Sequence, residues 1–116
     1  MRVGYHAAGS SAAGGEPFMI TVTLEMPIKP GKLAQFQSLI GPALKQTAAQ
    51  PGFIAIRILR PVEGEDTAMF IEEWETAQDY KNYLAWRADG NDVPGMEECV
   101  AGAPVLKMWG EVIASE

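Results

Sequence analysis

Apolar and polar residues alternate along the segment "MITVTLEM", residues 19–26. Its isoleucine, valine, leucine and methionine fall at every second position, and threonine or glutamate separates them. This period of two, rich in β-branched residues, predicts a strand with one buried face. The following "PIKPG" ends the strand, because Pro27 and Pro30 lack a backbone donor.

Two segments show the helical period instead. Residues 32–49 carry an apolar stripe at helical spacing, interrupted by Pro42, where a kink is expected. The stripe consists of Leu33, Phe36, Ile40, Leu44 and Thr47. A second helix is predicted over residues 76–88, where Thr76 can cap the first turn and Asp79 holds the position of a capping acid.

Three further strands complete the pattern. "FIAIRILR" (53–60) and "TAMFIEEWE" (67–75) flank the turn "PVEGED" and predict a hairpin. A short helical piece is expected over 96–101, and "VLKMWGEVI" (105–113) is the last strand. The order β-α-β-β-α-β predicts an α+β ferredoxin-like fold, with a four-stranded antiparallel sheet and both helices on one of its faces.

The predicted strands are apolar on both faces, although helices cover only one. In the strand at 53–60, Ile54, Ile56 and Ile58 fall on one side, while Phe53 and Leu59 fall on the other. The last strand likewise carries apolar side chains on both sides: Leu106 and Met108 on one, Val105 and Trp109 on the other. A sheet that cannot be solvated on its second face must bury it. The simplest partner is a second copy, which predicts a homodimer.

Composition narrows the class of protein. The chain has 116 residues, 47% hydrophobic and 21% charged, which is typical of one globular domain. Its net charge is −6 and its nine basic residues are scattered, which argues against a nucleic-acid or membrane-surface partner. Cys99 is the single cysteine, so a disulfide framework is excluded, and no apolar run is long enough to span a membrane. A cytoplasmic location is therefore expected.

The first 18 residues differ in composition from the rest. The segment "AAGSSAAGG" within 1–18 has little to bury and predicts a flexible leader or extension, whereas 19–116 form the domain. His6, the single histidine, lies in the leader and has no expected chemical role. One histidine and one cysteine are too few for a structural zinc site, so no metal is expected. The sequence also has no GxGxxG, GxxxxGK(S/T) or CxxC motif, and no cofactor is expected.

Several stretches together resemble the antibiotic biosynthesis monooxygenase family. They are "TAAQPGF", "MFIEEWE", "YKNYLAWR" and "GAPVLKMW". The resemblance covers residues 19–112, and the strand-end "E-x-W-E" is its most specific element. It implies a dimeric α+β barrel, in which two sheets pack face to face, and a ligand cavity between sheet and helices. It also implies oxygenation of a quinol-like or phenolic aromatic compound without metal or flavin.

Such chemistry requires aromatic walls, a base for the phenolic proton and stabilisation of an oxyanion. The resemblance implies that Trp74, at the strand end, lines the pocket; the alternative is an indole that plugs the junction of sheet and helix. Glu72 shares a strand face with Phe70 and Trp74, and burial there would make it a base. The alternative for Glu72 is a cross-strand ion pair with Arg57.

The second helix supplies further candidates. Tyr80 and Tyr83 are three residues apart and share one side of the helix. Tyr80 follows Trp74 by six residues, as a pocket tyrosine does in polyketide-oxygenating relatives, and would orient a substrate hydroxyl; the alternative is a core tyrosine. Arg87 would steady an oxyanion or pair with surface acids. The predicted catalytic residues are Trp74, Tyr80 and Glu72. The predicted substrate-binding residues are Phe36, Ile40, Phe70, Tyr83 and Arg87.

Departures from the family limit the functions to consider. The haem-degrading branch uses a histidine on the second helix, where this chain has Tyr83 and Leu84, so haem degradation is not expected. Some oxygenase relatives carry an asparagine where Phe70 stands. The first hypothesis is a dimeric, cofactor-independent monooxygenase. The alternative is a non-catalytic dimer of the same fold, a small-ligand-binding or stress-response module.

Overall fold

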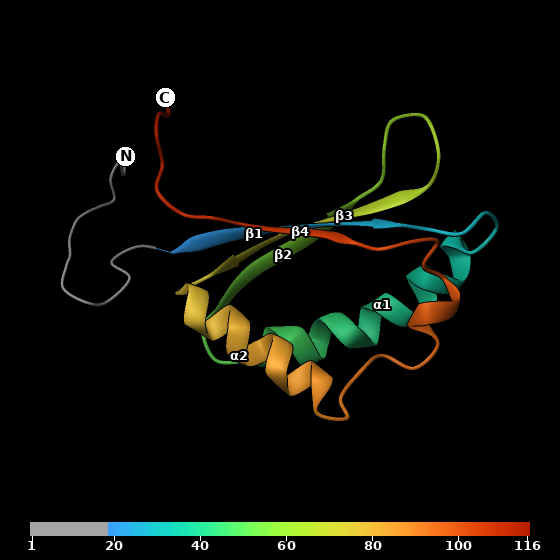
Figure 1. Cartoon of the computed structure of the whole chain (residues 1–116), viewed down its shortest axis with the longest axis horizontal. Helices are drawn as coiled ribbons and strands as arrows, with labels where there is room; N and C mark the ends of the chain where they lie inside the picture. The colour runs from blue at the N-terminus through green and yellow to red at the C-terminus, as the bar shows by residue number, and fades with distance from the viewer. Residues whose placement is uncertain (1–18) are drawn as a thin grey trace.

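The computed structural model describes residues 19–116, so the predicted leader at 1–18 and His6 lie outside the described residues. The predicted order of elements is confirmed (Figure 1). The elements are β1 (Ile20–Pro27), α1 (Leu33–Ala48), β2 (Phe53–Leu59), β3 (Thr67–Trp74), α2 (Ala77–Ala88), the 3₁₀ turn η1 (Met96–Glu98) and β4 (Val105–Trp109). The predicted ferredoxin-like α+β fold is therefore confirmed.

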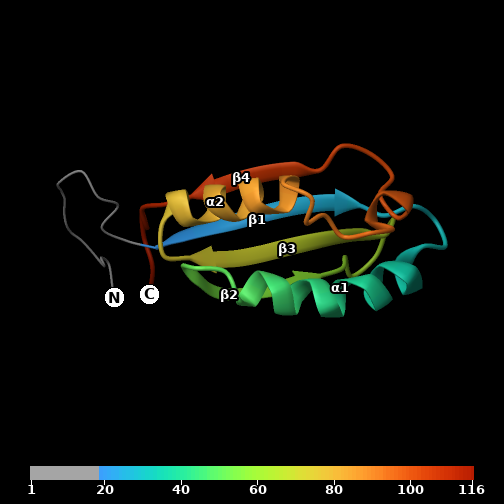
Figure 2. The same ribbon diagram turned by 90° about the horizontal axis from the view of Figure 1, so that it is seen from below.

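The four strands form one antiparallel sheet in the order β2-β3-β1-β4. Both helices lie on one face of this sheet, and no helix of residues 19–116 lies on the other face (Figures 1 and 2). β1 and β3 are therefore the inner strands, and each has a neighbour on both sides. Side chains of β3 that face the helices are placed at the centre of the domain.

The helix-facing layer has two buried clusters of different character. One contains Ile28, Phe36, Ala68, Phe70 and Cys99, and the partly buried side chains packed against it are leucine, isoleucine and methionine. The other is aromatic and contains Ile20, Val22, Trp74 and Tyr80, with Phe53 and Tyr83 packed against it. The alternation of β1 places Ile20 and Val22 on this face, as predicted. Cys99 is fully buried, consistent with an apolar role.

Strand β2 departs from the predicted alternation. Phe53 pairs with Trp74, but Ala55 pairs with Glu73, so Ile54 is an extra residue in a β-bulge. The bulge shifts Phe53 to the helix side, where it packs edge-to-face on Trp74, with ring centroids 5.5 Å apart. The prediction that Phe53 lies on the face opposite Ile56 was therefore wrong. A strict period of two cannot anticipate such an insertion.

One strand end differs from the prediction, because β4 ends at Trp109, four residues before the predicted end at Ile113. α1 continues from Leu33 to Ala48 without a break at Pro42, and the kink expected there stays a prediction. The predicted cap of α2 is confirmed, because the Thr76 hydroxyl accepts the backbone N–H of Asp79 at 3.0 Å. Gly52 fixes the start of this helix against the sheet. It has φ 84°, and a Cβ there would collide with the Asp79 side chain.

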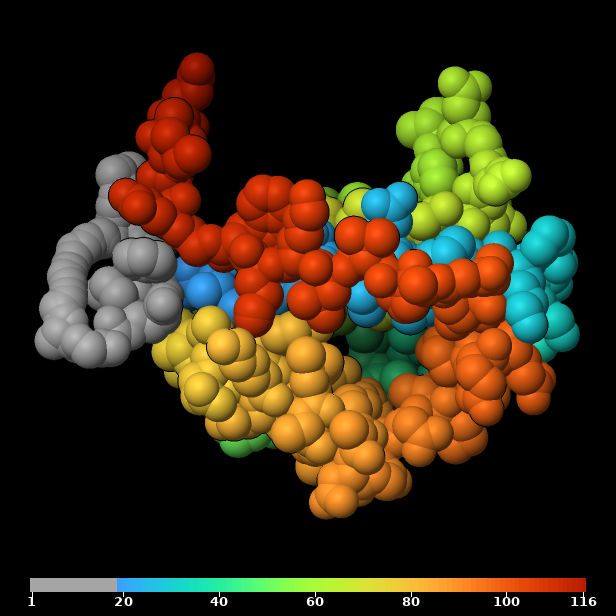
Figure 3. Space-filling model, viewed as in Figure 1, coloured from blue at the N-terminus to red at the C-terminus, as the bar shows by residue number. Residues whose placement is uncertain are grey.

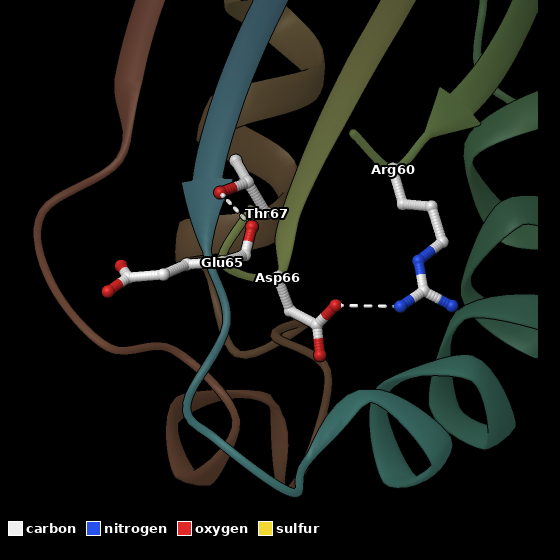
Figure 4. A network of polar contacts seen from close by, with 4 residues as sticks. All are labelled: Arg60, Glu65, Asp66 and Thr67. Atoms are coloured by element: carbon white, nitrogen blue, oxygen red, sulfur yellow. Dashed lines mark hydrogen bonds and ion pairs between the residues drawn. The ribbon is translucent and has the colours of Figure 1, made fainter. Parts of the chain in front are cut away.

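The open face of the sheet is flanked by two projecting segments. The β2–β3 turn and residues 110–116 both extend away from the helices (Figures 1 and 3). An ion pair between Arg60 and Asp66, 2.9 Å apart, joins the two ends of the turn (Figure 4). Between these segments the sheet exposes Leu59, Val105 and Trp109. The open face therefore carries exposed apolar side chains, as the sequence predicts; the homodimer inferred from it stays a prediction.

Candidate active site: a cavity between sheet and helices

A cavity of about 160 Å³ lies between the sheet and both helices. Its lining residues come from every element that faces this layer except β4: Leu24, Met26, Ile40, Ala43, Leu44, Thr47, Ile56, Phe70, Glu72, Tyr80, Tyr83, Leu84, Arg87, Val93 and Met96. Figure 3 shows a hollow in the surface between α2, β4 and the segment that carries η1. Apolar cavities of about 150 Å³ bind benzene, so this one has room for a single aromatic ring.

Glu72 is the carboxyl group of this cavity. It lies on β3 between Val22 and Ile56, its partners in the neighbouring strands, and its exposed fraction is only 3%. Its Oε1 accepts a hydrogen bond from the indole Nε1–H of Trp74 at 3.0 Å. Burial raises the pKa of Glu72 and outweighs this hydrogen bond, which lowers it. Glu72 therefore holds a proton more tightly than an exposed glutamate does.

The predicted alternative for Glu72, an ion pair with Arg57, was wrong. Arg57 pairs with Ile71 in the β2–β3 ladder, so its side chain lies on the open face. Glu72 points to the helices, on the other side of the sheet. No salt bridge involves Glu72 among residues 19–116, and its Oε2 has no hydrogen-bond partner there. One carboxyl oxygen is thus held in place and the other is left for a ligand.

Trp74 lies behind Glu72, away from the cavity. Its side chain is fully buried and packs against the rings of Tyr80 and Tyr83, with centroids 5.6 and 5.2 Å away. It does not line the cavity, and Glu72 occupies its one donor. The geometry favours the packing alternative and gives the indole a further task. Trp74 fixes the orientation of the Glu72 carboxyl group.

Tyr80 is the second polar residue of the cavity with an atom that has no partner in the described part of the chain. It is 1% exposed, lines the cavity, and its hydroxyl has no hydrogen-bond partner among residues 19–116. Burial, and then the nearby charges of Glu72 and Tyr83, raise the pKa of Tyr80 well above its usual value. The phenol therefore stays protonated and can donate a hydrogen bond. A buried hydroxyl without a partner is unfavourable, so the site favours a ligand with an oxygen.

Tyr83 is held in a network that leaves it no free hydrogen. Its hydroxyl lies 3.0 Å from the Thr47 hydroxyl and accepts the Nε–H of Arg87 at 3.0 Å. Thr47 donates to the Ala43 carbonyl at 3.1 Å, so its oxygen must accept the proton of Tyr83. Tyr83 therefore shapes the cavity wall, while Tyr80 keeps the free phenol.

Arg87 connects the two helices. Its N–H groups donate to Tyr83, to the side chains of Gln46 and Thr47, and to the carbonyls of Ala43 and Asn91, at 2.8–3.2 Å. A guanidinium has five N–H donors, and these contacts occupy all of them. The prediction that Arg87 steadies an oxyanion gains no support from this geometry. Arg87 instead holds α2 and the loop after it against α1.

The structure thus brings six of the eight predicted site residues to one cavity: Ile40, Phe70, Glu72, Tyr80, Tyr83 and Arg87. Phe36 lies one layer behind, with its ring edge-on to Phe70 at 6.2 Å, and Trp74 is behind Glu72. The sequence interpretation missed Thr47 as a polar wall residue, although its place in the apolar stripe was recognised. It also missed Val93, from the loop after α2, and Met96, the first residue of η1.

Residues 19–116 contain no group of histidine, cysteine and acidic side chains that could hold a metal ion. In the same range no helix is long and apolar enough to cross a membrane.

The profile of the antibiotic biosynthesis monooxygenase family matches residues 19–88, more than half of the chain. Among curated protein sequences, none matches. Several solved structures are similar in fold. A conserved protein from Methanosarcina mazei Go1 has a TM-score of 0.72 at 18% identity, covering 82% of this chain and 94% of its own.

Two more structures of similar fold differ in what their names say of function. SnoaB, a cofactor-independent oxygenase from Streptomyces nogalater, has a TM-score of 0.67 at 16% identity, covering 84% of this chain and 99% of its own. The NE2512 protein of unknown function from Nitrosomonas europaea has a TM-score of 0.67 at 17% identity, covering 88% and 96%. At these identities the likeness shows the fold, and the profile shows the family. The chain belongs to the antibiotic biosynthesis monooxygenase family.

Proposed function

We propose that this protein is a cofactor-independent monooxygenase of a quinol-like or phenolic aromatic compound. One observation carries the proposal: a buried carboxyl, Glu72, keeps one oxygen free beside the unpaired phenol of Tyr80, in a cavity the size of one ring. Raised proton affinity suits a group that removes a proton near neutral pH. The name of SnoaB, a cofactor-independent oxygenase of similar fold, agrees with this reaction class.

The chemistry needs no electron donor besides the substrate. Ionised Glu72 takes the proton of a substrate hydroxyl, and the resulting phenolate passes one electron to O₂. The substrate radical and superoxide combine at a ring carbon, and Glu72 returns its proton to give a hydroperoxide. Glu72 then removes the proton of that carbon, the O–O bond breaks, and the departing hydroxide leaves as water. A hydroquinone and O₂ thus give a hydroxyquinone and water, with all four electrons supplied by the substrate.

The remaining residues prepare these steps. Tyr80 donates a hydrogen bond to the oxygen that becomes anionic, which favours the phenolate over the phenol. Trp74 holds Oε1 of Glu72, which leaves Oε2 to accept the proton of the substrate hydroxyl. The walls formed by Ile40, Phe70 and Ile56 exclude water and protect the radical pair from side reactions.

The proposed working form is a cytoplasmic homodimer. Val105 and Trp109 on the open face of β4 are 55% and 50% exposed, and Leu59 on β2 is 42% exposed. Large apolar side chains that share one face favour an interface, and a two-fold axis would let the same patch bury itself in both copies. A chain with a single cysteine is suited to a reducing compartment.

Oxygen consumption with a panel of monocyclic hydroquinones and phenols tests the function. We expect consumption above the rate of autoxidation, with one atom of ¹⁸O₂ in the product and the other in water. Leu84→Trp should fill the cavity from its exposed rim and stop the reaction, whereas Ala85→Trp, on an exposed position outside the lining, should not. If compounds bind but none consumes oxygen enzymatically, the protein is a non-catalytic binding module instead.

A further inference from the structure

We propose that a groove beside helix α1 is a second subsite, which binds an alkyl or prenyl-like side chain carried by the quinol ring. The proposal rests on the proposed function, because it extends the substrate from the ring to a ring with an apolar substituent. The groove lies between α1 and the β2–β3 edge of the sheet and has a volume of about 290 Å³. It is larger than the ring cavity and separate from it.

The walls of the groove are apolar along most of their length. Leu33 and Phe36 of α1 face Ile58 of β2 and Ala68 of β3 across it. Phe36 and Ala68 are themselves buried. Contact with such walls stabilises a saturated chain through the hydrophobic effect, in proportion to the area it buries. Among the described residues that line the groove, none is a buried carboxyl or phenol that would recognise a second polar ring.

Two side chains connect the groove to the ring cavity. Ile40 and Leu44 line both spaces, and they lie one turn apart on α1. Both are only half-buried, so the partition between the spaces consists of two aliphatic side chains. A ring in the cavity with its substituent toward α1 would direct that substituent over these side chains into the groove.

The opposite exit suits an apolar chain less well. There the cavity shares Arg87, Val93 and Met96 with a wide, open depression that also contains Asp92 and Glu97. These acidic groups favour solvent at this end, and covering them with a hydrocarbon would cost free energy. We therefore assign this end of the cavity to entry of the ring and of oxygen, and the groove to the apolar substituent of the ring.

The residues at the outer end of the groove indicate that the substituent bound there is uncharged. The cation of the lining is Arg60, and its guanidinium is bound to Asp66 at 2.9 Å (Figure 4). A fatty-acid carboxylate would have to compete with Asp66 for this group. Gln37 and Thr67 offer neutral polar atoms at the same end. A neutral alkyl or isoprenoid chain fits these surroundings without breaking an existing ion pair.

Calorimetric titration with alkyl-substituted benzoquinones tests the groove without turnover, because the oxidised ring does not react. In a series from methyl to decyl, we expect the Kd to fall about fourfold for each buried methylene until the groove is filled. Gln37→Trp, on an exposed groove residue of α1, should abolish this gain and leave the methyl compound unaffected. Lys45→Trp, exposed on the same helix but lining neither space, should keep the gain.

Two results would overturn the proposal. One is a Kd independent of chain length. The other is a gain that Glu97→Trp, in the open depression, removes while Gln37→Trp does not, because the chain would then leave by the opposite exit. Failure of the proposed function looks different: the gain would be present and sensitive to Gln37→Trp, but no quinol would consume oxygen.

Discussion

Glu72 and Glu73 are consecutive in the sequence, yet they belong to the two different faces of the sheet. Glu72 points between the helices, where burial raises its pKa. Glu73 pairs with Thr21 and Ala55 on the open face and is only half-buried. The two residues are of the same type, so their positions in the alternation of β3 decide which carboxyl is buried at the cavity and which lies on the open face. The helix face encloses the cavity, while the open face carries exposed apolar side chains.

The largest expected effect separates these two glutamates. Glu72→Gln should lower kcat/KM for the best hydroquinone by about 10²–10⁴-fold, the range for loss of a general base. Glu73→Gln should change it less than about twofold, because its side chain does not reach the cavity. Steady-state oxygen uptake measures both. Equal rates for Glu72→Gln and wild type would remove Glu72 from the mechanism.

A substitution on the open face should change the dissociation constant of the proposed homodimer instead of the rate of oxygen uptake. Trp109→Glu should weaken the homodimer by at least about 30-fold in Kd, because it replaces a large apolar contact with a charge. Lys81→Glu, on the exposed side of α2, should leave the Kd unchanged. Sedimentation equilibrium distinguishes the outcomes. If wild type is a monomer at micromolar concentration, the open face is not a self-association surface.

The two tyrosines of the helix face allow a finer comparison. Tyr83→Phe should lower the free energy of unfolding by about 1–3 kcal/mol, because it leaves the Nε–H of Arg87 without its acceptor. Tyr80→Phe should cost little stability, since its hydroxyl has no partner among residues 19–116, but it should slow oxygenation. Urea unfolding and oxygen uptake on both variants test this division. It fails if Tyr80→Phe is the more destabilising change.

The smallest predicted effect is a pH dependence of stability. The folded state raises the pKa of Glu72 above its unfolded value, so the folded state binds the proton more tightly. The stabilisation that results from this tighter proton binding is fully present below the unfolded pKa of Glu72, and it is lost as pH rises through the folded pKa. Relative to Glu72→Gln, wild type should therefore become less stable from pH 4 upward, and Glu73→Gln should behave like wild type. Urea midpoints across pH 4–8 provide the measurement.

Much of this architecture could be predicted, because local patterns specify it. The period-two alternation of β1, the Thr76 cap and the turn between β2 and β3 are encoded within a few neighbouring residues. The same parity is enough to predict that Glu72, Phe70 and Trp74 share one face of β3. The bulge at Ile54 could not be predicted, because an inserted residue leaves no signal in a hydrophobic pattern.

The partners of the polar side chains in the site could not be predicted, for a different reason. The sequence leaves Arg57 open as a partner of Glu72, because the register between strands cannot be predicted from one chain. The observed register places Arg57 on the open face. The saturation of Arg87 depends on Gln46 and Ala43, more than 40 residues away in sequence. Long-range contacts of this kind decide whether a polar side chain serves the ligand or the fold.

The central claim is that Glu72 takes a proton from a phenol bound in the cavity. The most direct test is the absorption spectrum of 4-nitrophenol, a non-reactive single ring, bound at a pH below its own pKa in solution. Wild type and Glu73→Gln should bind it as the coloured phenolate, and Glu72→Gln should bind it as the neutral phenol. Neutral phenol bound to wild type, or phenolate bound equally to Glu72→Gln, would contradict the claim.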